Sequence, residues 1–112
     1  MSTVRLEGTA LAFDMYRGSG EREEIGRHEE FLFELAQASE TKCPQLLRIW
    51  KSFFNDPSIS AEQAGALVHE LIDLLAVNGG ASNKPLVNVV VRLLPFFSTA
   101  YRNQQEVRCQ SD

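Results

Sequence analysis

The residues from Ser60 to Gly79 constrain the fold most, because a helix start signal, an apolar stripe and a helix stop signal agree within one short stretch. Ser60 followed by Gln63 matches a capping box, and Gly79 suits the left-handed residue that ends many helices. The apolar residues of this stretch recur at three- and four-residue spacing and share one face: Ala64, Leu67, Val68, Leu71, Ile72 and Leu75. Its ionisable residues are expected in water on the other side: Glu62, His69, Glu70 and Asp73. We therefore predict a helix over residues 61–77 that offers little chemistry, because a solvated group has nothing to shift its pKa.

Three further helices are predicted. Residues 21–38 open with glutamates that suit a helix N-terminus, and Phe31 and Phe33 widen the apolar stripe that follows. Pro44 in a first turn and the stop at residues 55–57 bound a helix over residues 44–54. Its expected inward side chains are Leu46, Ile49, Trp50, Phe53 and Phe54. Residues 85–104 form the most apolar helix, and a kink is expected at Pro95 because proline cannot donate to the carbonyl of Val91.

The two ends of the chain are predicted to be extended. Alternating apolar residues from Val4 to Met15 indicate short strands, so residues 1–17 are expected to form an extended segment or a hairpin that turns near Gly8. Residues 105–112 are expected to be a tail. The β-branched run at residues 89–91 keeps a strand open as an alternative within the last helix. The predicted fold class is mainly α: one domain over residues 1–112, a compact bundle of about four helices with a short N-terminal β-hairpin.

Composition narrows the class of protein. The chain is 44% apolar and 23% charged, as ordinary globular proteins are, and its apolar runs are too short to cross a bilayer. The first seven residues include Arg5 and Glu7 where a secretory peptide would be apolar, so we expect a soluble cytoplasmic protein with no membrane association. Cys43 and Cys109 form no C-x-x-C pair and are expected to be reduced thiols, one at a helix start and one exposed in the tail.

The charge distribution argues against nucleic acid as a partner; its ordinary interpretation is solubility, and attraction to a basic partner is the alternative. The net charge is −4; residues 1–42 hold nine acidic and five basic side chains, whereas residues 84–112 hold two acidic and four basic ones. A nucleic-acid binder normally presents a basic face to phosphates. A nucleic-acid-associated regulator would need a basic stripe from the C-terminal part of the chain: Lys84, Arg92, Arg102 and Arg108.

Motifs for chemistry are weak. His69, Glu70 and Asp73 read H-E-x-x-D, but a zinc protease helix needs a second histidine at the last position, so no metal and no cofactor are predicted. His28 with Glu24 and Glu29 could form a general acid/base group, which keeps a small enzyme open as the alternative function. At the helix edge, a partly buried His28 without a catalytic role is the favoured interpretation.

The apolar surface exceeds what a lone bundle is expected to hide, which indicates association. We predict a non-catalytic protein-binding module, an acidic adaptor or inhibitor that acts through an apolar helix face, with a homodimer as one form. The candidate partner-binding residues are Phe31, Phe33, Glu30, Glu34, Val91 and Phe96. In size and charge, though in no motif, the chain resembles bacterial immunity proteins, which neutralise a toxin; that resemblance implies a protein partner, basic in charge.

Overall fold

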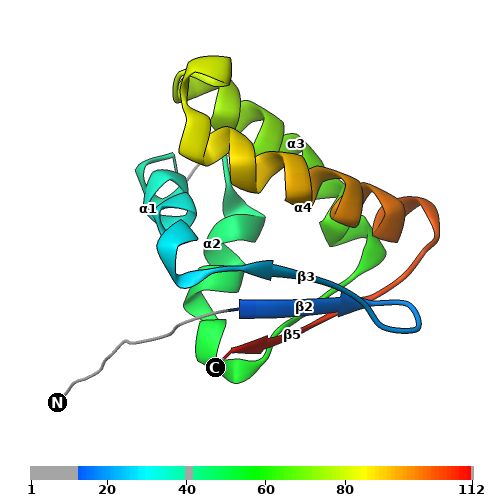
Figure 1. The fold of residues 1–112 in the computed structure, drawn as a ribbon. Coiled ribbons are helices and arrows are strands. Elements are labelled where there is room, and N and C mark those ends of the chain that lie inside the picture. Colours follow the sequence, from blue (N-terminus) through cyan, green and yellow to red (C-terminus); the bar gives the residue numbers. More distant parts are fainter. Residues whose placement is uncertain (1–12, 40–41, 112) are drawn as a thin grey trace, which may run out of the picture.

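A four-stranded antiparallel sheet packs against helices in the computed structural model, which describes residues 13–39 and 42–111 (Figure 1). The strands are β2 (Phe13–Arg17), β3 (Glu21–Ile25), β4 (Ser58–Ile59) and β5 (Val107–Ser111), in the spatial order β3-β2-β5-β4. The α-helices are α1 (Phe31–Ala38), α2 (Pro44–Lys51), α3 (Ala61–Val77) and α4 (Lys84–Arg102). Short 3-10 turns η1 (Arg27–Glu29), η2 (Phe53–Asn55) and η3 (Gly80–Ser82) join them. The prediction of about four helices agrees with this structure, but the fold is mixed α/β and not a purely helical bundle.

The hairpin of this fold joins β2 to β3. Phe13 pairs with Ile25 and Arg17 with Glu21, and the turn between the strands uses positive φ at Gly18 (57°) and Gly20 (129°), which glycine adopts without strain. The period-two pattern is confirmed at Phe13 and Met15, whose side chains are buried. The turn predicted near Gly8 lies outside the described residues.

The helix predicted over residues 21–38 is wrong in its first part. Residues 21–25 form the edge strand β3, and α1 begins only at Phe31. The glutamates that suggested a helix N-terminus stand on a sheet edge, where charged side chains oppose pairing with a further strand.

The C-terminal tail is also corrected. β5 lies between β2 and β4, with Met15 opposite Cys109 and Ile59 opposite Val107. Val107 and Cys109 are buried and Arg108 is exposed, so the period-two alternation is that of a strand with one covered face. Cys109 is therefore a core thiol and not an exposed one.

Helix α3 begins and ends where the sequence predicts. The Ser60 hydroxyl accepts from the backbone N–H of Gln63 at 3.1 Å, and the side-chain amide oxygen Oε1 of Gln63 accepts from the backbone N–H of Ser60 at 2.9 Å. Gly79 has φ 104°. Two positions differ from the prediction. Ile72 is 48% exposed, although it was expected inside, and Glu70 is only 5% exposed, although it was expected in water.

Helix α4 runs from Lys84 to Arg102 without a break at Pro95, so a strand at residues 89–91 is wrong. It lies beside α3, antiparallel to it, and its other flank faces the sheet (Figure 1). Its buried side chains are Leu86, Val89, Val90, Leu93, Phe96, Phe97 and Ala100.

Helix α2 ends at Lys51, before the predicted limit, and Phe54 is 68% exposed instead of inward; the side chain of Phe53 lies outside the described set. Along the described parts of the chain, no helix has the length and apolarity that crossing a bilayer requires.

Candidate protein-binding surface

The six predicted partner-binding residues separate into a buried and an accessible group. Phe33 is enclosed and stacks on Trp50 with ring centroids 5.0 Å apart, and Phe96 is buried edge-to-face against Phe97 at 5.5 Å. These two residues are therefore corrected to the core, because helix α2 covers Phe33 through Trp50 and strand β2 lies over Phe96 through Arg17. Phe31 and Glu30 are half-buried, whereas Glu34 is exposed.

Val91 is the predicted contact residue that lies on an apolar surface. It is 56% exposed on α4, and Tyr101 on the same helix and Ile72 on α3 are each 48% exposed. These residues belong to a surface that runs beside the line where the two helices meet. On each helix, the residues of this surface fall within about 80° of one another at 100° per residue. We call this surface the α3/α4 outer face; it comprises Gly65, His69, Ile72 and Ala76 on α3, with Val87, Val91, Leu94, Ser98 and Tyr101 on α4.

The two helices approach closely because Gly65 has no side chain. A Cβ atom at this position would lie 2.7 Å from Cδ1 of Tyr101, so the tyrosine ring rests directly on the glycine. Beside this contact the surface is hollowed into an open depression of about 380 Å³, whose lining includes Val68, His69 and Ser98. The outer face thus combines exposed aliphatic side chains with a shallow pocket that bears a tyrosine, a residue type frequent at interface centres.

Charges of opposite sign border the outer face on its two helices. On α3 the exposed acidic residues are Glu62 and Asp73, and on α4 the exposed basic residues are Lys84 and Arg102. Glu62 and Arg102 lie at the same end of the helix pair, since Gly65 contacts Tyr101 there. The border is therefore acidic on one side and basic on the other.

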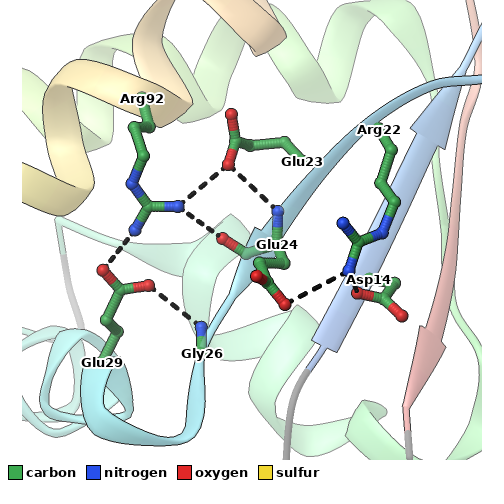
Figure 2. A network of polar contacts seen from close by, with 7 residues as sticks. All are labelled: Asp14, Arg22, Glu23, Glu24, Gly26, Glu29 and Arg92. Carbon is green, nitrogen blue, oxygen red and sulfur yellow. Dashed lines mark hydrogen bonds and ion pairs between the residues drawn. The ribbon is translucent and has the colours of Figure 1, made fainter.

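Arg92, which the basic stripe of a nucleic-acid regulator would need, instead joins α4 to the sheet and to η1 (Figure 2). One guanidinium nitrogen donates to Glu23 at 2.9 Å and to the backbone carbonyl of Glu24 at 3.0 Å, and the other donates to Glu29. Glu29 also accepts from the N–H of Gly26 at 3.0 Å. The two carboxylates and the carbonyl engage the guanidinium, so Arg92 is not available to a phosphate backbone, and Arg108 lies apart from α4 on β5.

Glu70 holds the first turn of α2 from a neighbouring helix. Its two carboxylate oxygens accept from the backbone N–H groups of Gln45 and Leu46, each at 3.0 Å. Cys43, at the N-cap position of α2, gives no side-chain cap, so Glu70 takes that role. Burial raises the pKa of Glu70, and the two N–H groups oppose this rise. The middle residue of the H-E-x-x-D pattern is therefore structural, and the described residues contain no group of three or more side chains suited to a metal.

His28 lies at the surface. It is exposed in η1, and not partly buried as predicted, so no packing around it excludes water in the way general acid/base catalysis requires. Another hollow, lined by Arg17, Glu23, Arg92, Phe96 and others, contains no histidine. Arg17 lies over the Phe96 ring at 5.3 Å and helps to close that part of the core.

Comparison of the chain with protein-family models, curated proteins and solved structures finds no match. The sequence pattern identified Val91 but missed Ile72 and Tyr101. Ile72 sits at the edge of the apolar stripe of α3, about 80° from its first member on a helical wheel, and that offset is the signal that could have placed it at the surface.

Proposed function

We propose that this protein is a non-catalytic protein-binding module whose contact surface is the α3/α4 outer face. The observation that supports the proposal is the gathering of Ile72, Val91 and Tyr101 on one side of the two longest helices, each about half exposed. Single exposed apolar residues are ordinary on protein surfaces, but a contiguous patch with a polar border is typical of interaction sites.

The side chains of this face suit binding more than catalysis. Valine and isoleucine have few rotamers in a helix, so fixing them against a partner costs little conformational entropy. Tyr101 is already held against Gly65 and presents both an apolar ring and a hydroxyl. His69 also lies on this face, and it is exposed to water.

Two surface variants and a matched control test the proposal. Val91→Glu and Ile72→Glu place a charge within the face, and we expect each to weaken partner binding at least tenfold without a loss of helicity. Val77→Glu is the control, because Val77 is 58% exposed on α3 and points about 110° away from the centre of the face.

The measurement is affinity capture from the native source with the four proteins side by side, followed by calorimetry with the purified partner. A partner that binds the wild type and Val77→Glu but neither face variant supports the proposal. Equal capture by all four proteins would show that the outer face is not the contact surface.

A further inference from the structure

We infer that the outer face binds a second copy of this chain, in a two-fold dimer that places α3 of each copy on α4 of the other. This inference rests on the proposed function, since it names the occupant of the same surface. Three features support the dimer: the signs of the charges at the border, the height of these charges along the helices, and the size of the face.

The charges select the arrangement of the two copies. Exposed Glu62 and Asp73 make the border acidic on α3, and exposed Lys84 and Arg102 make it basic on α4. A two-fold axis parallel to the helices sets α3 of one copy over α4 of the other, so that opposite charges meet. A two-fold axis across the helices would instead set α3 over α3, with acidic borders facing each other.

A two-fold axis parallel to the helices also leaves each residue at the same height along the helix axis in both copies. Gly65 contacts Tyr101 within one copy, so Glu62 and Arg102 both lie at that end of the helix pair. Rotation about an axis parallel to the helices does not change the level of a residue. Glu62 of one copy therefore faces Arg102 of the other, and the symmetry produces this pair twice.

The size of the face permits a weak dimer. The 17 residues of α3 span about 25 Å at 1.5 Å per residue. Two packed helices are about 20 Å wide, so the face covers roughly 500 Å² per copy, or about 1,000 Å² in the dimer. That area is at the lower limit of specific interfaces, and we expect a dissociation constant in the micromolar range.

Charge exchange between copies is the decisive test. Glu62→Lys alone sets two positive charges against each other in both intermolecular pairs, and Arg102→Glu alone sets two negative charges against each other. We expect each variant to dimerise at least tenfold more weakly than the wild type. In an equimolar mixture of the two variants, the mixed dimer has one pair of unlike charges from the two replaced side chains and one from the two original ones.

The mixed dimer restores both pairs of opposite charges. The lysine introduced at position 62 of one copy meets the glutamate introduced at position 102 of the other, and the unchanged Glu62 of the second copy meets the unchanged Arg102 of the first. Both pairs are again oppositely charged, so the affinity of the mixed dimer should return to within about threefold of the wild type.

Sedimentation velocity over a concentration series, with one variant carrying a fluorescent label, measures the homodimers and the mixed dimer separately. Val91→Glu should abolish the dimer and Val77→Glu should not. A wild type that remains monomeric at several hundred micromolar overturns the second copy as occupant. The differential capture described above still decides whether the face binds another protein, so the two failures are distinguishable.

Recovery in the mixture supports the arrangement with α3 on α4. A wild-type dimer whose charge variants show no recovery on mixing overturns that arrangement. A dimer that persists in Val91→Glu overturns the outer face as its interface. Circular dichroism of every variant confirms that the change in association does not come from unfolding.

Discussion

Replacement of Glu70 tests whether a carboxylate from α3 caps the first turn of α2. The perturbation is Glu70→Gln, which keeps the shape of the side chain but leaves one acceptor oxygen in place of two. In the wild type, one oxygen accepts from Gln45 and the other from Leu46, and the N–H of Leu46 is buried. One of these backbone groups must lose its partner in the variant.

The expected loss follows from these two bonds. A hydrogen bond to a charged group contributes about 1.5–3 kcal/mol, and a buried donor left without a partner costs about 1–3 kcal/mol. Removal of a carboxylate that is 5% exposed recovers part of its desolvation cost. We therefore expect Glu70→Gln to lower the free energy of unfolding by about 1–2 kcal/mol near neutral pH.

The pH dependence has a definite sign. Burial raises the pKa of Glu70 above its ordinary value of 4.5, so the folded protein holds the proton more tightly than the unfolded chain does. The stabilising contribution of this group is complete below pH 4.5 and is lost as the pH rises through the pKa of the folded state. The stability advantage of the wild type over Glu70→Gln should thus shrink from mildly acidic to neutral pH and then stay constant.

Urea unfolding followed by circular dichroism at a series of pH values measures both effects. Glu34→Gln on α1 is the matched control, because Glu34 is exposed and lies outside the outer face, so its replacement should change stability by less than about 0.5 kcal/mol. Equal stabilities of the two variants would refute the capping role of Glu70. An advantage that grows as the pH rises would refute the direction of its pKa shift.

Three other predictions concern the network at Arg92, the cap of α3 and the core thiol. Arg92→Met should lower the free energy of unfolding by about 1–3 kcal/mol in denaturant titrations, and full stability in this variant would contradict the role of the network. Arg92→Lys should recover only part of the loss, because one ammonium group cannot bind three separated acceptors. Ser60→Ala should cost about 1 kcal/mol and speed amide exchange in the first turn of α3, and unchanged exchange would argue against the cap. Because burial raises the pKa of Cys109 to about 12, its thiol should react with a disulfide reagent at pH 8 only in urea, and fast labelling of the native protein would show that β5 does not stay paired.

Much of the helical part of this fold could be predicted because its signals are local. The cap at Ser60, the three- and four-residue spacing and Gly79 all act within α3, so short-range hydrogen bonds and one apolar face define that helix. Val91, predicted as a contact residue, is exposed, since so apolar a helix cannot bury its whole circumference.

The sheet depended on contacts between distant parts of the chain. Phe13 lies opposite Ser111, and the two residues are almost the whole length of the chain apart. Nothing within β3 or β5 indicates such a partner, and short strands gain their stability from pairing and not from local propensity. The glutamates of β3 therefore suggested a helix, and β5 suggested a tail.

The sequence by itself determined the helices α3 and α4 and the excess of apolar side chains that they carry. The tertiary structure decided which apolar side chains the neighbouring elements cover, so Phe33 on α1 and Phe96 on α4 are enclosed while Val91, Ile72 and Tyr101 stay at the surface. It likewise turned Glu70 from a solvated residue into the cap of α2. The physical reason is that burial belongs to the arrangement of neighbouring elements, whereas capping and periodicity belong to residues a few positions apart.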